Sequence, residues 1–150
     1  MKRTIWFDMD GTIANLYAVD NWLGKLRSYD PSPYAEAEVM LNMSLLARYL
    51  NKLQKLGYWI GIISWASKDS TKEYDEAVAD TKRKWLATHL ASVAFDFTLI
   101  TAYGVPKELW MNTTDDILFD DNEEIRGEWD GEAHEPNEIL SVLKELIDRG

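Results

Sequence analysis

Apolar runs of strand length recur along the chain, and helical patterns lie between them. The runs cover residues 4–7, 58–63, 95–100 and 117–119. None of them alternates cleanly between apolar and polar side chains, which is typical of strands that are covered on both faces. The pattern therefore predicts a parallel sheet buried between two layers of helices.

Three segments show the helical spacing, with apolar side chains every three or four residues. One precedes the second run and stops near Gly57, a residue suited to a helix C-terminus. The second spans about residues 72–90, and the third follows Pro136. The apolar positions of the first segment are Val39, Met43, Leu46, Leu50 and Leu53. Strands that alternate with helices predict an α/β fold, a three-layer Rossmann-like parallel sheet flanked by helices.

Residues 13–34 fit this alternation less well. Residues 15–27 have the composition of a helix, and Asp30-Pro31-Ser32-Pro33 reads as a stiff turn or loop. Ligands of open α/β sheets bind beyond the carboxyl ends of the strands, where this segment begins. We therefore expect one domain over residues 1–150, with a small helical cap insert at about 13–34 that roofs a site.

Composition narrows the class of protein. The 150 residues carry a formal net charge of −10 and include no cysteine. The charge argues against extended nucleic acid as a partner, because such binders need a basic surface. The lack of cysteine excludes disulfides and thiolate metal sites. No apolar segment has the length of a signal peptide or a membrane span, so we expect a cytoplasmic protein with no membrane partner.

Candidate chemistry begins directly after the first strand, at Asp8-Met9-Asp10-Gly11-Thr12. Two carboxylates two positions apart point the same way on an extended backbone, and glycine lets the chain turn away. Such close acids repel unless a cation or a proton lies between them. The alternatives are a plain turn and a calcium loop. The calcium loop fails, because Ile13 and Val19 stand where it needs glycine and glutamate.

Other strand ends supply further groups. The second strand leads to Ser64, and the fourth leads to Asp120-Asp121-Asn122. Lys82 lies on the apolar side of its predicted helix, where it either meets anions or extends its charged end to water. Lys107 is the rival cation, and we expect it to lie farther out. His89 and His134 are assigned no catalytic role.

The order of these groups resembles the four motifs of the haloacid dehalogenase (HAD) superfamily of phosphohydrolases. The resemblance covers residues 4 to about 122, and its first motif is the most specific. The helical insert, and a lysine three residues before Trp85, are similar to the 5′(3′)-deoxyribonucleotidase branch. The small size and the run from Ile62 to Lys68 are also similar to HAD-like proteins of bacteria and phages.

The resemblance implies a role for each matching residue. Asp8 would be the nucleophile that forms an aspartyl-phosphate, and Asp10 would be the acid and base. The resemblance also implies a Mg²⁺ cofactor and a phosphate-binding set. Mg²⁺ would bind the Asp8 carboxylate, the Asp10 carbonyl and Asp120. The phosphate would meet Ser64, Lys82 and the amides of Met9 and Gly11, with Thr12 and Asp121 in support.

The expected function is a Mg²⁺-dependent phosphomonoester hydrolase acting on a small phosphorylated metabolite, with a nucleoside monophosphate favoured. Aromatic side chains in or near the cap, and Trp65 outside it, are candidates to stack on a base, although most aromatic residues serve packing. Those in the cap are Tyr17, Trp22, Tyr29 and Tyr34. Two alternatives stay open: a polynucleotide 3′-phosphatase, and a non-catalytic binding or regulatory protein on the same scaffold. Oligomeric state is not predicted.

Overall fold

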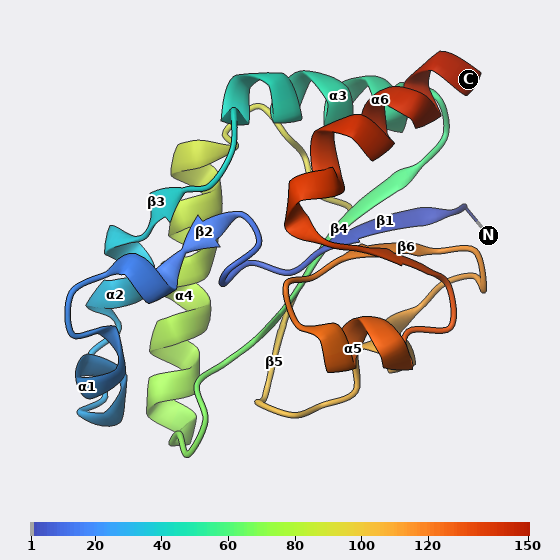
Figure 1. The fold of residues 1–150 in the computed structure, drawn as a ribbon. Helices are drawn as coiled ribbons and strands as arrows, with labels where there is room; N and C mark the ends of the chain where they lie inside the picture. The colour runs from blue at the N-terminus through green and yellow to red at the C-terminus, as the bar shows by residue number, and fades with distance from the viewer. Residues whose placement is uncertain (1) are drawn as a thin grey trace.

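The computed structural model describes residues 2–150 and contains a five-stranded parallel sheet (Figure 1). The strand order is β5-β4-β1-β6-β7, so the first strand of the chain lies at the centre. The strands are β1 (Thr4–Phe7), β4 (Trp59–Trp65), β5 (Phe97–Thr101), β6 (Ile117–Phe119) and β7 (Glu132–His134). The predicted α/β fold class is confirmed. The edge strand β7 was not predicted, because its three residues form no apolar run.

Alternation along β1 divides the core into two layers. Ile5 and Phe7 face a large cluster that includes α3 (Met43–Lys55), the second half of α4 (Lys72–His89) and α6 (Ile139–Arg149). Trp6 faces the opposite side, where it packs with Ile125 of α5 (Glu123–Glu128). Helices therefore cover both faces of the sheet, as the continuous apolar runs indicate.

The register of the central strands determines which side chains meet at the carboxyl edge. Phe7 is paired with Ile62 of β4 on one side and with Phe119 of β6 on the other. Asp8 and Asp120 each follow directly after a member of this row. The two carboxylates thus leave the sheet side by side, from strands that lie more than one hundred residues apart in the sequence.

The segment after β1 forms a small insert of its own. Antiparallel strands β2 (Ala14–Asn15) and β3 (Glu38–Val39) enclose η1 (Leu16–Ala18), α1 (Trp22–Arg27) and α2 (Ser32–Glu36). The single helix predicted over 15–27 is wrong, because Asn21 has a positive φ of 53° and separates two short helices. The loop predicted at 30–33 is wrong in part: α2 begins at Ser32, since proline is tolerated in a first turn.

Buried hydrogen bonds connect the insert to the rest of the molecule. The Tyr34 hydroxyl lies 2.5 Å from the Ser67 hydroxyl, and the Tyr74 hydroxyl donates to the Asp30 carbonyl at 2.8 Å. Tyr34 and Tyr74 also pack with Leu16 in an apolar cluster against α4. These contacts hold the insert over the carboxyl end of the sheet.

The boundaries of the predicted helices need small corrections. The helix before β4 begins at Met43, where the Asn42 side chain accepts from the Leu45 amide, so Val39 lies outside it. Gly57 has the positive φ expected after a helix end. His134 is the last residue of β7. The last helix is preceded by η3 (Pro136–Glu138).

Asp116 differs from its exposed neighbour Asp115. Its side chain is completely buried. One carboxylate oxygen accepts from the Thr4 amide and the other from the Trp6 indole. The amide of Asn112 and the hydroxyl of Thr113 also donate to it. Asp116 therefore joins the loop before β6 to the central strand.

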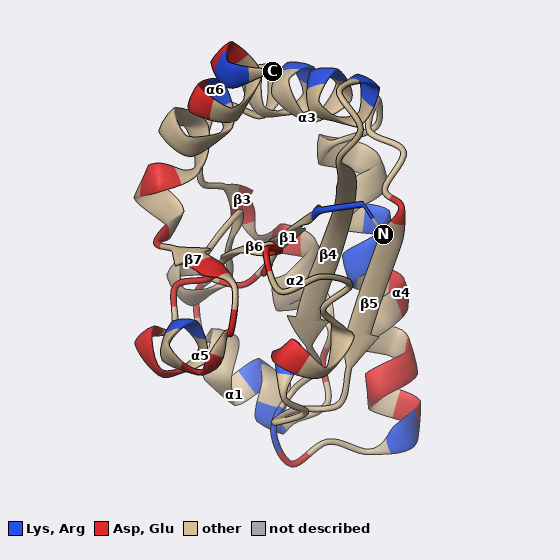
Figure 2. Cartoon of the chain, turned by 90° about the vertical axis from the view of Figure 1, so that its right-hand side faces the viewer, with Lys and Arg blue, Asp and Glu red and all other residues tan. Residues whose placement is uncertain are grey.

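Charge is unevenly spread over the molecule. Acidic residues gather around α5 and β7, whereas Lys and Arg residues mark the outer side of α3 (Figure 2). Across residues 2–150, no helix combines the length and apolar character needed to cross a bilayer.

Candidate active site

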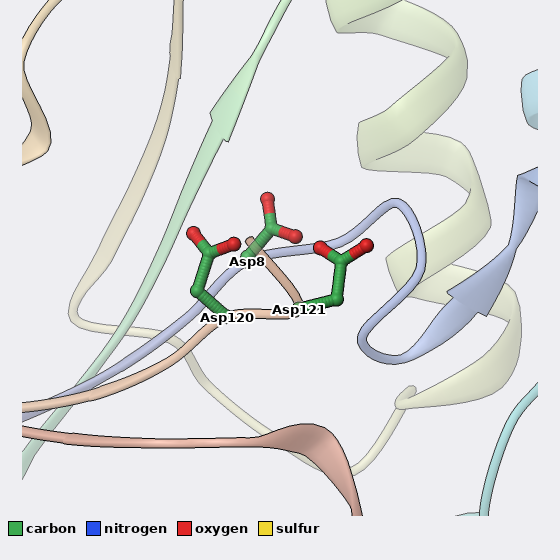
Figure 3. Close-up of side chains that lie close together, drawn as sticks. All are labelled: Asp8, Asp120 and Asp121. Atoms are coloured by element: carbon green, nitrogen blue, oxygen red, sulfur yellow. The ribbon is translucent and has the colours of Figure 1, made fainter. Parts of the chain in front are cut away.

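Three carboxylates converge at the carboxyl ends of β1 and β6. One oxygen from each of Asp8, Asp120 and Asp121 lies within 4.8 Å of the others. Figure 3 shows the three side chains next to one another, Asp8 from the end of β1 and the other two from consecutive positions after β6. Such a group of hard oxygen ligands suits a divalent cation such as Mg²⁺.

Gly11 allows the Asp121 side chain to lie close to the loop after β1. It has a positive φ of 79°, and a Cβ at this position would lie 2.2 Å from an Asp121 carboxylate oxygen. The same Cβ would lie 2.8 Å from the Tyr17 ring. Glycine is therefore required both by the backbone conformation and by the closeness of Asp121.

The Thr12 hydroxyl links the two loops that carry the acids. It donates to an Asp8 carboxylate oxygen at 2.9 Å and accepts from the Asp121 amide at 3.2 Å. Thr12 is itself buried. It thereby fixes the orientation of Asp8 relative to the loop after β6.

Lys107 lies at the centre of the acid cluster, in η2 (Lys107–Trp110). Its Nζ is 2.9 Å from Asp8 Oδ1 and 2.6 Å from Asp120 Oδ2, and only 2% of its side chain is exposed. Burial alone lowers the pKa of this lysine, but the carboxylates of Asp8 and Asp120 outweigh burial and raise it. The expectation that Lys107 lies farther out is therefore wrong.

Lys82 occupies a different position from the one expected. Its Nζ donates to Asp10 Oδ2 at 2.8 Å, to Ser64 Oγ at 2.7 Å and to the Trp65 carbonyl at 2.8 Å. The anion it meets is Asp10, and neither Asp8 nor Asp121 is among its partners. Ammonium has three donors, and protein acceptors take all three. Lys82 therefore has no hydrogen left for a phosphate in this arrangement.

Asp10 is paired with Lys82 but still faces the cavity. Its side chain is 17% exposed, and among the described residues no hydrogen bond ends on its Oδ1. Burial raises the pKa of Asp10; Lys82 opposes this shift and Asp8 adds to it. A carboxyl group with a raised pKa and one free oxygen can give a proton to a leaving group.

The acids after β6 also have raised pKa values. Burial, together with the charge of Asp8, raises the pKa of Asp120 to about 6, although Lys107 opposes the shift. Burial and the charge of Asp8 likewise raise the pKa of Asp121 to about 7. Ionisation of these two acids therefore costs more free energy than ionisation of an exposed carboxyl group.

The donor set fits a divalent metal ion. The site contains the four carboxyl groups of Asp8, Asp10, Asp120 and Asp121 and two lysine ammonium groups, so two negative charges remain unbalanced when all four acids are ionised. Within residues 2–150 the Asp10 carbonyl oxygen accepts no hydrogen bond. The nearby carbonyl oxygens of Met9 and Ala14, by contrast, accept hydrogen bonds from backbone amides. Asp8, Asp120, Asp121 and the Asp10 carbonyl can therefore hold the ion, all through oxygen.

A cleft of about 920 Å³ opens above these groups, between the strand ends and the insert. Asp8, Asp10, Lys107, Asp120 and Asp121 line its floor. Ser64 and Lys82 are fully buried beneath it and are not lining residues. The predicted phosphate-binding pair thus lies behind Asp10 rather than in the cleft.

The predicted backbone donors differ from each other. The Gly11 amide donates to the Ala14 carbonyl at 2.8 Å, so it is already engaged. The Met9 amide donates to no acceptor in the described part of the chain, and it stays a candidate phosphate donor. The Gly11 amide therefore stabilises the turn after β1 and is no longer a candidate phosphate donor.

Ser67 and Tyr103 are among the cleft residues that the sequence analysis did not single out. Ser67 lies in the loop after β4 with its hydroxyl beside Tyr34, and Tyr103 follows β5 with its ring 5.0 Å from that of Trp65. Both come shortly after a strand end, which was the available signal. Trp65, Tyr17, Trp22, Tyr29 and Tyr34 also line the cleft, as expected of base-stacking candidates.

Comparisons with known proteins yield a likeness of fold. No family model and no curated protein matches the sequence significantly. Among solved structures, the chain is similar to D,D-heptose 1,7-bisphosphate phosphatase from Burkholderia thailandensis, with a TM-score of 0.50 and 17% sequence identity. The likeness covers 82% of this chain and 68% of the other.

Proposed function

We propose that the protein is a Mg²⁺-dependent phosphomonoester hydrolase that acts through an aspartyl-phosphate on Asp8. The observation that carries the proposal is the arrangement around Asp8: a lysine ammonium at 2.9 Å, two further carboxylates within 4.8 Å and Asp10 two residues on, all beside one cleft. The motif resemblance to the HAD superfamily and the fold shared with a phosphatase support it.

Each side chain has a part in the reaction. An Asp8 oxygen attacks phosphorus, and Asp10 gives a proton to the departing alcohol. Asp10 then takes a proton from the water that releases phosphate from Asp8. Lys107 uses two of its three donors on Asp8 and Asp120, so one remains to stabilise charge on the transferring group. We assign the phosphate-binding role to Lys107 in place of Lys82.

Mg²⁺ would be held by Asp8, Asp120, Asp121 and the Asp10 carbonyl. When bound, it supplies positive charge that offsets the negative charge of the phosphate and of the acid cluster. Asp121 is an added ligand in this proposal, because its carboxylate reaches the same point as the other two. The Thr12 hydroxyl would fix the position of Asp8 relative to the loop that carries Asp121.

The cleft favours a substrate with one phosphate and an uncharged, aromatic remainder. Apart from the acids already named, Asp69, Glu123 and Glu124 line it, against the cations Arg27, Lys68 and Lys107. This acidic lining disfavours a second phosphate and a polynucleotide strand. The aromatic side chains of the insert and of Trp65 suit a base, so a nucleoside monophosphate, as in the 5′(3′)-deoxyribonucleotidase branch, is the proposed substrate class. No membrane partner is proposed, and the protein is expected to be cytoplasmic.

The test is a phosphate-release assay with Mg²⁺ over nucleoside monophosphates, nucleoside bisphosphates, sugar phosphates and 3′-phosphorylated oligonucleotides. Nucleoside monophosphates should be hydrolysed with the highest kcat/KM. Release from the oligonucleotide alone would favour the polynucleotide phosphatase, and no release from any compound would favour a non-catalytic scaffold.

A further inference from the structure

Lys82 is a second buried cation that the reaction described above does not use. Its side chain is 1% exposed and its charge lies beneath the floor of the cleft. A buried ammonium costs free energy unless its surroundings satisfy it. Its three hydrogen bonds satisfy all three ammonium hydrogens. Lys82 is therefore held in a defined position, unlike a lysine at the edge of the core that extends its charged end to water.

The three acceptors come from two separate parts of the site. Asp10 belongs to the loop after β1, whereas Ser64 and the Trp65 carbonyl belong to the end of β4. Lys82 itself stands on α4, and the Tyr34 ring of the insert lies 4.8 Å from its Nζ. One ammonium group therefore joins Asp10, the sheet, a helix and the insert.

We infer that Lys82 is a positioning residue for Asp10: it holds Oδ2 so that Oδ1 alone faces the leaving group in the cleft. This inference rests on the proposed function, in which Asp10 protonates the leaving alcohol. The two lysines then divide the work. Lys107 contacts the nucleophile Asp8 and binds the phosphate, whereas Lys82 orients the proton donor Asp10.

The inference predicts which substrates are cleaved more slowly when the Lys82 ammonium group is removed. In Lys82→Met, first-turnover cleavage of an alkyl phosphate such as a nucleoside 5′-monophosphate should fall about 100-fold or more, since its alcohol needs a proton. First-turnover cleavage of p-nitrophenyl phosphate should fall less than about 10-fold, because p-nitrophenolate leaves without one. Asp10→Asn should show the same selectivity. Lys107→Met should slow both substrates equally, and Lys84→Met should slow neither.

Two further variants separate positioning from a merely structural role. Asp10→Asn/Lys82→Met leaves no unpaired buried charge, and its first-turnover rates should equal those of Asp10→Asn alone. Because the chain has no cysteine, Lys82→Cys can be unfolded, alkylated selectively with 2-bromoethylamine to rebuild the ammonium group, and refolded, which should restore alkyl phosphate cleavage.

The outcomes are distinct. Equal losses for both substrates in Lys82→Met, no loss for either, or a further 10-fold loss when Lys82→Met is added to Asp10→Asn would each overturn the positioning role. If the wild-type protein cleaves neither substrate, the proposed function fails instead.

Discussion

Lys107 and Asp120 form a buried ion pair, with Nζ 2.6 Å from Oδ2. They lie thirteen positions apart in the sequence, Lys107 in η2 after β5 and Asp120 directly after β6. The same ammonium reaches Asp8 on β1. The nucleophile proposed here is thus held between a cation from one side of the sheet and an acid cluster from the other.

Replacement of Lys107 should abolish most of the activity. In Lys107→Met the phosphate loses its only proposed lysine donor, and we expect kcat to fall about 100-fold or more. Steady-state phosphate release measures this, with Lys84→Met as the matched control because Lys84 is 78% exposed and forms a surface ion pair with Asp80. A Lys107→Met protein with kcat near that of Lys84→Met would return the phosphate-binding role to Lys82.

Mg²⁺ should stabilise the folded protein. It binds acids that repel one another in its absence, and a ligand that binds only the native state raises the free energy of unfolding. A hundredfold excess over Kd corresponds to a rise in Tm of about 5 to 10 °C. Differential scanning fluorimetry against EDTA-treated protein measures the rise.

Asp121→Asn is the informative variant for the metal. It removes one of the three carboxylates of the cluster, so the rise in Tm at a fixed Mg²⁺ concentration should shrink. A Mg²⁺ response identical to that of the wild type would exclude Asp121 as a ligand.

Without metal, stability should fall as pH rises from about 4 to 7. The folded-state pKa values of Asp120 and Asp121 are raised to about 6 and about 7, above the ordinary 3.8, so the folded protein binds more protons than the unfolded chain. This contribution is complete below pH 4 and is lost through pH 7. Urea unfolding in EDTA at several pH values checks the direction.

The variant Asp121→Asn also serves as a control for the pH dependence of stability. Asp121→Asn should flatten the decline between pH 6 and 7, where Asp121 ionises in the folded protein. Metal-free stability that rises over this interval would contradict the assigned pKa shifts.

Asp116 should be a structural residue with no part in the reaction. Asp116→Ala would leave the Thr4 amide and the Trp6 indole buried without acceptors, and it would also remove the acceptor of two partly buried donors. Each such group costs about 1 to 3 kcal/mol, so the variant should lose at least about 3 kcal/mol of unfolding free energy. Surface variant Asp115→Ala should lose little. Chemical denaturation of both compares them.

The sequence predicts the parts of the site that follow strands, because continuous apolar runs and the acids after them are local signals. Asp8, Asp10, Asp120 and Asp121 come together as parallel strand ends must. Lys107 could not be placed in this way, since no periodicity reports burial in a loop. Its position depends on how the chain after β5 folds back over β1 and β6.

Helical spacing placed Lys82 on the buried side of α4 but did not identify its partners. Which acid a buried lysine meets depends on the height of the helix relative to the strand ends, and this is a tertiary property. The buried position of Asp116 has no local signal for a related reason: within an acidic stretch, one buried carboxylate has the same local pattern as its exposed neighbours. The short strand β7, with polar residues at an edge, gave no hydrophobic signal.

The most direct measurement of the central claim is chemical trapping of a phosphorylated Asp8. The protein is mixed with its best substrate and Mg²⁺, quenched in acid during turnover and reduced with borohydride, which converts an aspartyl-phosphate to homoserine. Mass spectrometry of the N-terminal peptide should then show homoserine at position 8, and none without substrate or in Asp8→Asn, which should be folded but inactive. Rapid turnover with Asp8 unmodified, or an active Asp8→Asn protein, would contradict the account.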